Sequence, residues 1–239
     1  DMQRFLAAVS VVVVVLLAAP AWSAEVVRMR VDDTIQPASR QFIERVLEEA
    51  AARDAGLVVM ELDTPGGLLD TTRDITSAII GSPVPVVVYV APSGARAASA
   101  GFFILIAADV AVMAPGTNTG AAHPVGGQGE NLPEDVRDKA TNDAAAMIRS
   151  LAEQRGRNSE TAERAVRESI SLTADEALAE KLIDFIAKDL DDLLAQLDGY
   201  ELRRGDGETR TLELEDAVVV ELEASFAERL LSVLANPNI

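Results

Sequence analysis

Apolar runs alternate with amphipathic segments along most of the chain. Mainly apolar stretches at 26–31, 57–62, 84–90 and 110–113 predict buried strands. Between them, apolar residues spaced three or four apart predict helices at 37–52, from the turn after residue 67 to 80, at 134–155, 173–181 and 190–197. A continuous apolar stretch at 97–108 is interpreted as a buried helix. This alternation predicts an α/β fold with a largely parallel sheet.

The N-terminal segment 1–23 has the features of a secretory signal peptide. Arg4 precedes an uncharged apolar run at 5–19, and Ala21 and Ser23 provide small residues for cleavage after Ser23. The run is shorter than the roughly 20 residues of a membrane-spanning helix, and an uncleaved anchor is the alternative. Under either interpretation, the body of the protein is exported and lies outside the cytoplasm.

The C-terminal segment 199–239 is expected to form a hairpin and a helix. Gly205-Asp206-Gly207 has the composition of a tight turn between two short strands. Ser225 and Glu228 have capping-box spacing at the start of a helix with an apolar stripe. Two interpretations remain open for this helix: it packs on the preceding domain, or it leads into a membrane segment missing from this chain.

Composition excludes several classes of function. The chain has 239 residues, a formal charge of −18, no cysteine and a single histidine. Without Cys there is no disulfide, no thiolate nucleophile and no Cys-based metal site, and one His cannot make a multi-His centre. The acidic balance argues against nucleic acid as a partner, because such binding relies on Lys and Arg. We therefore expect no cofactor and no metal site.

Two clusters of small residues are the candidates for chemistry. Asp63-Thr64-Pro65-Gly66-Gly67 follows a predicted buried strand, where paired glycines allow the backbone to approach a ligand and direct N–H groups toward it. The second cluster, 94–101, places Ser99 among small side chains at a predicted helix start. N–H groups there, including that of Ala100, could stabilise an oxyanion. Taken singly, these features are better explained by an ordinary turn and an N-cap.

Taken together, the motifs resemble a known family. Thr64-Pro65-Gly66-Gly67, 97–101 (Ala-Ala-Ser-Ala-Gly), 113–116 (Met-Ala-Pro-Gly) and 120–124 (Gly-Ala-Ala-His-Pro) are similar to ClpP-class serine peptidases, and most similar to the NfeD family of membrane-bound proteases. Segments 155–158 and 171–177 extend the resemblance, which covers about 25–198. It implies a ClpP/crotonase-like fold of repeated ββα units. It also implies a protease domain at 25–198 followed by a membrane-embedded part absent from this chain.

The resemblance assigns roles to individual residues. It implies that Ser99 is the nucleophile, and that the N–H groups of Gly67 and Ala100 form the oxyanion hole with Gly66 shaping the turn. In relatives of archaeal type the base is described as a lysine on the long helix, and we matched that position to Arg149. Arginine cannot be a base near neutral pH, because its pKa lies above about 12.

Two residues are candidates for the missing base. His123 lies 24 residues after Ser99, which resembles the placement of the catalytic histidine in ClpP, and its ordinary pKa suits the task. Lys139 lies ten residues before Arg149, about 15 Å along a helix, so it replaces the family lysine only if the helix is shifted or if it acts across a dimer. We rank His123 first. Glu168 or Asp175 would then orient the imidazole, and Arg96 and the loop 126–132 are candidates for substrate contact.

The leading hypothesis is a membrane-associated serine endopeptidase that cleaves hydrophobic segments of proteins such as stomatin-like partners. Two alternatives remain: a ClpP-fold scaffold whose site has decayed, and a crotonase-like enzyme acting on acyl-CoA. Family resemblance implies at least a homodimer, and no nucleic acid is expected as a partner.

Overall fold

A computed structural model describes residues 25–124, 133–204 and 209–235, with side chains described up to residue 232. The predicted signal peptide, the loop 126–132 and the turn 205–207 lie outside the described residues. Those three predictions therefore stay predictions.

The centre of the molecule is a parallel sheet of six strands in the order β11-β1-β2-β3-β5-β8. The bounds are β1 (Glu25–Val31), β2 (Leu57–Leu62), β3 (Val86–Val90), β5 (Val110–Met113), β8 (Phe185–Ile186) and β11 (Val218–Glu221). β2, β3 and β5 are buried at every position, because both faces of a parallel sheet are covered. This confirms the predicted α/β class, and β1, β2, β3 and β5 begin and end within two residues of the predicted bounds.

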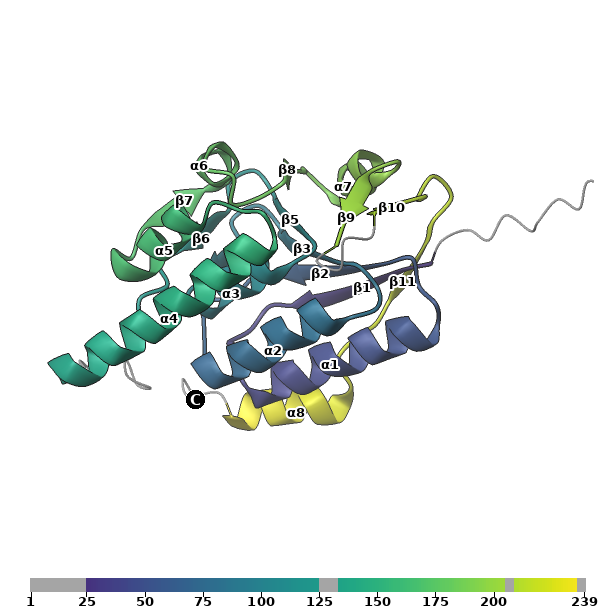
Figure 1. The fold of residues 1–239 in the computed structure, drawn as a ribbon. Coiled ribbons are helices and arrows are strands. Elements are labelled where there is room, and N and C mark those ends of the chain that lie inside the picture. Colours follow the sequence, from purple (N-terminus) through teal and green to yellow (C-terminus); the bar gives the residue numbers. More distant parts are fainter. Residues whose placement is uncertain (1–24, 125–132, 205–208, 236–239) are drawn as a thin grey trace, which may run out of the picture.

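Helices cover the two faces unequally. Six helices contribute to the larger core: α1 (Pro37–Ala52), α2 (Leu69–Gly81), α3 (Ala100–Ala107), α4 (Glu134–Gln154), α5 (Ser159–Arg167) and α6 (Ala174–Ala179). The other face packs against α7 (Leu190–Leu197) and the hairpin of β9 (Glu201–Arg203) and β10 (Thr209–Thr211). Figure 1 shows α7 and the hairpin on the side of the sheet opposite α1 and α2.

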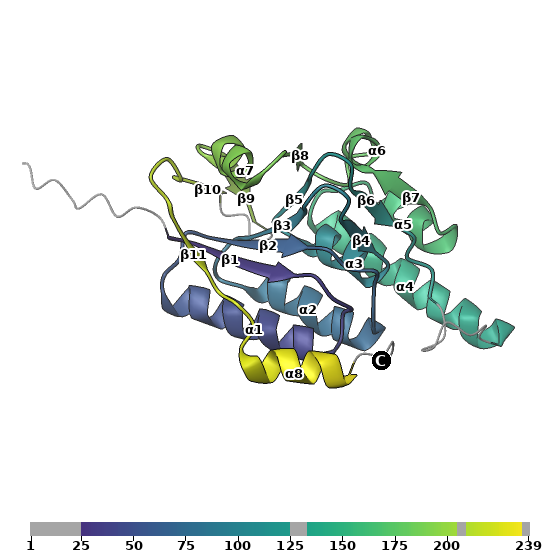
Figure 2. The ribbon, with the colours of Figure 1, turned by 180° about the vertical axis from the view of Figure 1, so that it is seen from behind.

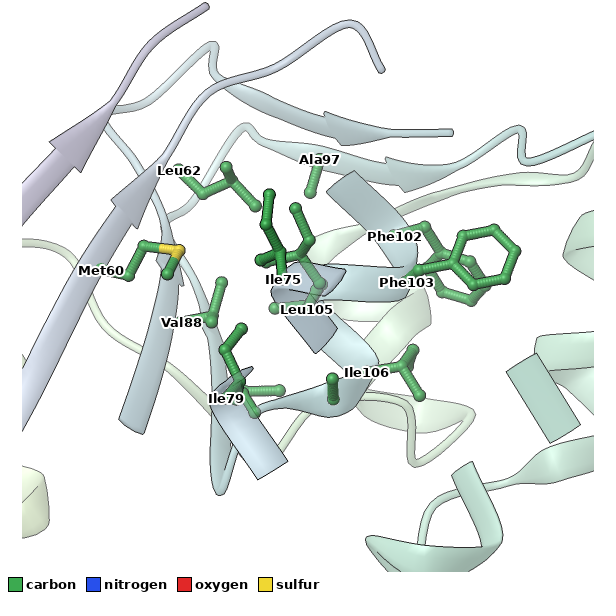
Figure 3. Close-up of a cluster of buried hydrophobic side chains, with 14 of the residues drawn as sticks. Met60, Leu62, Ile75, Ile79, Val88, Ala97, Phe102, Phe103, Leu105 and Ile106 are labelled. Carbon is green, nitrogen blue, oxygen red and sulfur yellow. The ribbon is translucent and has the colours of Figure 1, made fainter. Parts of the chain in front are cut away.

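The larger core joins the strands to the helix that begins beside Ser99. Met60 and Val88 project from neighbouring strands toward Ile75 and Ile79 of α2 and Leu105 of α3 (Figure 3). All eight residues of α3 are buried, so the helix has no solvated face. Its burial fixes the position of its first turn relative to the strand ends.

A second, three-stranded sheet lies beside the first and changes one prediction. It contains β4 (Arg96–Ala98), β6 (Asn118–Gly120) and β7 (Ser171–Thr173). The predicted helix at 97–108 is therefore wrong at its start, because Ala97 and Ala98 are extended and pair with Thr64 and β6. Helix α3 begins at Ala100. The short apolar residues of this region fit either structure, and the hydrogen bonds to Thr64 decide between them.

The segment after residue 198 adds a strand to the central six-stranded sheet. β11 pairs in parallel with β1, and α8 (Phe226–Ala235) packs against α1, as Figure 2 shows from behind. The apolar stripe expected on this helix is only partly covered, since Phe226 is 83% exposed and Leu230 48% exposed. Within the described residues, no helix is both long and apolar enough to cross a membrane.

The sequence analysis did not predict helix α5 or the short strands β4, β6, β7, β8 and β11. Helix α5 is polar on average, but Asn158 caps it by accepting a hydrogen bond from the Thr161 N–H, and its alanines and Val166 are spaced three and four apart. That spacing was a usable signal. Helix α6 (Ala174–Ala179) is shorter than the predicted 173–181.

Candidate functional site

The turn after β2 is held in one conformation by Thr64. Its buried hydroxyl accepts a hydrogen bond from the Gly66 N–H at 3.1 Å and lies 3.2 Å from the Gly66 carbonyl. Gly66 has φ = 126°, a value that residues with a side chain rarely adopt. The turn lies at the carboxyl ends of the parallel strands, where α/β proteins usually bind their ligands.

Ser99 lies directly against this turn. A Cβ built on Gly66 would lie 2.8 Å from the Ser99 Cβ and 3.2 Å from its Oγ, so only glycine leaves room for the serine side chain. Ser99 is half-buried and has φ = 51° and ψ = −112°. A residue other than glycine in this region carries backbone strain, which is concentrated at functional sites. A strained turn between a strand and a helix is also how many hydrolases present a nucleophilic serine.

The strain at Ser99 is maintained by hydrogen bonds on both sides. The Ser99 N–H donates to the Gly120 carbonyl at 2.9 Å, and the Ser99 carbonyl accepts from the Phe102 N–H at 3.0 Å. On the far side of α3, a Cβ on Gly101 would meet the Thr64 methyl at 2.5 Å. The start of α3 is thereby packed tightly against the Thr64 turn.

The two predicted oxyanion donors are available. Among the described residues, the N–H groups of Gly67 and Ala100 have no hydrogen-bond partner. Gly67 is exposed, and Ala100 is the first residue of α3, where N–H groups have no partner within the helix. The structure thus brings Ser99, Gly66, Gly67 and Ala100 together as predicted. Free donors at a helix N-terminus are suited to stabilising negative charge.

His123 lies near the site but is turned toward α5. It follows Gly120 by three residues, and Gly120 bonds the Ser99 N–H. Its Nδ1 lies 3.2 Å from the carbonyl of Val166 and is placed to donate to it, which would leave Nε2 as an acceptor. Neither candidate carboxylate bonds the imidazole within the described residues: Glu168 is exposed and pairs with Arg164, and Asp175 is exposed at the start of α6. No contact between His123 and Ser99 occurs among the described residues.

Lys139 and Arg149 lie on different sides of α4. Lys139 is exposed and has no ion pair or hydrogen bond within the described parts of the chain. Arg149 pairs with Glu163 of α5, so its guanidinium is already occupied by an acid. Lys139 has no contact with Ser99 in the single chain described.

An ion pair places Lys139 at the same end of the molecule as Ser99. Asp143 of α4 pairs with Arg73 of α2, and α2 and α4 both run away from the carboxyl ends of the strands (Figure 1). Lys139 lies one turn before Asp143 on the same helix face. Leu68, next to Gly67, lies a similar distance before Arg73 along α2. The lysine is therefore at the level of the glycine turn.

The sequence analysis assigned no role to two residues that hold the glycine turn in place, Ile35 and Thr64. Ile35 bonds the glycine turn on its outer side: its N–H donates to the Gly66 carbonyl at 2.8 Å and its carbonyl accepts from the Leu68 N–H at 2.9 Å. Nothing local in the sequence marks Ile35. Thr64 belongs to the quoted motif, and its position two residues before Gly66 was the available signal.

The parallel sheet and the helices that cover it have the fold of the ClpP class of α/β proteins. The solved structure of ClpP1 from Listeria monocytogenes superposes with a TM-score of 0.57 at 18% identity, covering 70% of this chain and 94% of that one. At this identity the likeness establishes the fold alone. It confirms the ClpP-like fold expected from the motifs.

Within that class, the chain belongs to the NfeD1b N-terminal domain family, whose sequence model matches residues 25–220. It is homologous to the membrane-bound protease PH1510 of Pyrococcus horikoshii, with 34% identity over 241 residues. That alignment covers 100% of this chain but 54% of the relative, so the chain spans about half the length of that protein.

Solved structures of the corresponding domain are also similar. A lysine-to-alanine mutant of the 1510-N membrane-bound stomatin-specific protease, in complex with a substrate peptide, has a TM-score of 0.82 at 33% identity and covers 89% of this chain and 98% of its own. A serine-to-alanine mutant of the same protease has a TM-score of 0.79 at 33% identity, covering 85% and 99%. These comparisons confirm the resemblance to the NfeD family.

Proposed function

We propose that this chain is a serine endopeptidase domain in which Ser99 attacks the carbonyl carbon of a peptide bond. The observation that carries the proposal is the contact between Ser99 and Gly66, which only a glycine permits, beside two N–H groups without partners. Attack by Oγ forms a tetrahedral oxyanion, and collapse expels the amine and leaves an acyl-enzyme. Water then hydrolyses the ester and regenerates the serine.

The Gly67 and Ala100 N–H groups are proposed to bind the oxyanion. Removing one such donor typically costs about 10²–10³ in rate. Both belong to the backbone, so their effect depends on how firmly the turn and the start of α3 are held. The Thr64 hydroxyl and the packing of Gly101 provide that rigidity.

For the base we now place Lys139 ahead of His123. In the relative, the substituted lysine follows the substituted serine by 41 positions. Lys139 follows Ser99 by 40 positions, whereas Arg149 follows it by 50. This spacing supports Lys139 as the counterpart of that lysine, and the pairing of Arg149 with Glu163 agrees with a structural role for the arginine.

A lysine acts as a base only when its amine is neutral. Exclusion of water lowers the pKa of lysine, and Lys139 is exposed in the single chain. We propose that bound substrate or a second copy of the chain covers it. His123 is the second candidate, because the placement of its Nδ1 against the Val166 carbonyl would leave Nε2 free to accept a proton.

The proposed substrates are hydrophobic segments of membrane-associated proteins, including stomatin-like proteins. The relative is described as stomatin-specific and membrane-bound. On this chain, Leu68 is 51% exposed immediately after Gly67, and Val136 is 45% exposed one turn before Lys139. An apolar peptide would cover both side chains. Action outside the cytoplasm and assembly as a homodimer or larger oligomer are part of the same proposal.

The test is cleavage of a hydrophobic peptide and of a charged peptide of equal length. We expect wild type to cleave the hydrophobic peptide faster and Ser99→Ala to lose at least about 10³-fold in kcat/KM. Lys139→Ala should lose a similar factor, while Lys188→Ala, which changes an exposed lysine outside the proposed site, should be unaffected.

Three other results would contradict parts of this proposal. Loss in His123→Ala with full activity in Lys139→Ala would make His123 the base. Equal activity of wild type and Ser99→Ala would exclude the peptidase and favour a scaffold. Acyl-CoA turnover that does not need Ser99 would favour the crotonase-like alternative.

A further inference from the structure

The glycine turn that supplies the Gly67 donor is supported from outside by a single short segment. Ile35 exchanges two backbone hydrogen bonds with the turn, to the Gly66 carbonyl and from the Leu68 N–H. A Cβ on Gly67 would lie 2.0 Å from the Ile35 carbonyl oxygen, so the two backbones are in direct contact. A displacement of Ile35 would therefore move the Gly67 N–H.

Residues on both sides of Ile35 are bonded to one residue of the C-terminal helix. The amide Nε2 of Gln36 donates to the Ser232 Oγ at 3.0 Å and to the Ser232 carbonyl at 3.2 Å. The Ser232 hydroxyl in turn donates to a carboxylate oxygen of Asp33. Ser232 thus holds the chain two residues before Ile35 and one residue after it, from nearly 200 positions away in the sequence.

Apart from the bonds to Ser232 and those of Ile35 to the glycine turn, the hydrogen bonds of this segment within the described residues are local. The Gln36 N–H donates to the Ser39 Oγ at 2.8 Å, and the Thr34 N–H donates to the Asp33 carboxylate at 2.7 Å. Gln36 is 3% exposed, so water does not readily replace Ser232 as its partner. A buried amide left without a partner costs free energy, which favours any rearrangement that satisfies it.

The described side chains of helix α8, residues 226–232, reach the body through polar contacts. Besides Ser232, Glu228 accepts two hydrogen bonds of 2.9 Å from Arg45 of α1. Phe226, Leu230 and Leu231 are between 48% and 83% exposed. A cavity of about 580 Å³ lies beside the contact and is lined by α8, the end of β11 and the segment after β1. The Ser232 contact is the part of this attachment that bears on the segment 33–36.

We propose that Gln36 and Ser232 are positioning residues for the oxyanion hole: docking of α8 on the segment 33–36 holds Ile35, and through it the Gly67 N–H, in the catalytic position. This inference rests on the proposed function for the catalytic role of Gly67. The coupling itself is a property of the fold. It makes the C-terminal helix a control element for the site.

The experiment compares wild type, Ser232→Ala and Ser232→Thr in the full chain. Hydrogen exchange is followed at the Leu68 amide, which bonds Ile35, and peptide cleavage is measured in parallel. We expect Ser232→Ala to exchange Leu68 at least about 10-fold faster and to lose about 3–10-fold in kcat with KM unchanged, because an oxyanion donor acts mainly in the transition state. Ser232→Thr keeps a hydroxyl and should restore both values.

A control separates positioning from a general loss of stability. Asp189→Ala removes the N-cap of α7, which accepts from the Asp192 N–H on the opposite face of the sheet. It should lower the melting temperature by a similar amount and leave the Leu68 exchange and kcat unchanged. Equal effects in both variants would overturn the proposal.

The two proposals fail differently. If wild type shows no Ser99-dependent cleavage, the proposed function fails, and the Leu68 exchange still decides whether α8 holds the turn. Unchanged exchange in Ser232→Ala overturns the coupling whatever the activity. Faster exchange with unchanged kcat shows that the turn moves without a catalytic consequence and overturns the positioning role.

Discussion

The carboxyl and amino edges of the parallel sheet, where its strands end and begin, differ in whether their polar groups are hydrogen-bonded. At the carboxyl edge, Ser99 is strained and the Gly67 and Ala100 N–H groups have no partners in the described residues. At the amino edge, Asp109, just before β5, has a side chain 1% exposed that accepts from the Val86 N–H at 2.9 Å and from Arg155 at 2.7 Å. The carboxyl edge thus has N–H donors without partners, whereas at the amino edge the Asp109 carboxylate is hydrogen-bonded and ion-paired.

The amino edge ties distant segments together. Arg155 also donates to the Ala107 carbonyl at the end of α3, and Arg204, from the hairpin, reaches Asp109 at 3.4 Å. Arg157 donates to carbonyls at the end of α3 and pairs with Asp184 before β8. Burial lowers the pKa of the Arg155 guanidinium, against the raising effect of Asp109. The comparison indicates that buried ion pairs stabilise one edge, while the other holds the strained backbone of Ser99.

The largest predicted effect on stability is at Asp109. Asp109→Ala removes the acid from two buried or half-buried arginines and the acceptor from the Val86 N–H, and we expect a loss of about 3–5 kcal/mol in the free energy of unfolding. Urea denaturation measures it, and Asp109→Asn serves if the alanine variant does not fold. Activity per folded molecule should be unchanged. A loss below about 1 kcal/mol would contradict the assigned role of this edge.

A smaller effect of opposite sign is predicted at Ser99. Glycine adopts φ = 51° without strain, so Ser99→Gly should raise the free energy of unfolding by about 1 kcal/mol while abolishing cleavage. Thermal denaturation measures the gain, about 2–4 °C in a chain of this size. Asp54→Gly is the matched control, since Asp54 has φ = 54° at the end of α1. It should stabilise similarly and leave activity intact. A destabilised Ser99→Gly would refute the strain.

The smallest predicted effect concerns pH and the C-terminal helix. Hydrogen bonds from Arg45 lower the pKa of Glu228 from its ordinary 4.5 to about 2. A lowered carboxyl pKa stabilises the folded state above the ordinary value, and this contribution disappears as pH falls toward 2. Glu228→Gln should therefore melt about 1–2 °C below wild type at pH 7, because an ion pair near the surface contributes less than about 1 kcal/mol. The difference should shrink as pH falls below 4.5 and vanish below about pH 2, and Glu213→Gln, an exposed control, should show none. A difference that persists at low pH would contradict the ion pair.

Local sequence predicted much of the fold and the centre of the site. Buried strands and amphipathic helices follow from short-range patterns, and Thr64, Gly66 and Ser99 lie in two compact motifs. The start of α3 was misplaced because bonds to Thr64, more than thirty residues earlier, extend Ala97 and Ala98. The Asp109–Arg155 pair and the Ser232–Gln36 bonds join residues 46 and 196 positions apart. Such contacts are set by tertiary packing, and no local pattern encodes them.

The most direct test of the account is the crystal structure of the chain after reaction with a fluorophosphonate, whose phosphonyl oxygen occupies the place of the oxyanion. We predict phosphorus bonded to the Ser99 Oγ, with the oxygen about 2.7–3.1 Å from both the Gly67 and the Ala100 nitrogen atoms. Labelling of another residue, or a Ser99 adduct whose oxygen avoids both N–H groups, would contradict the proposed active site.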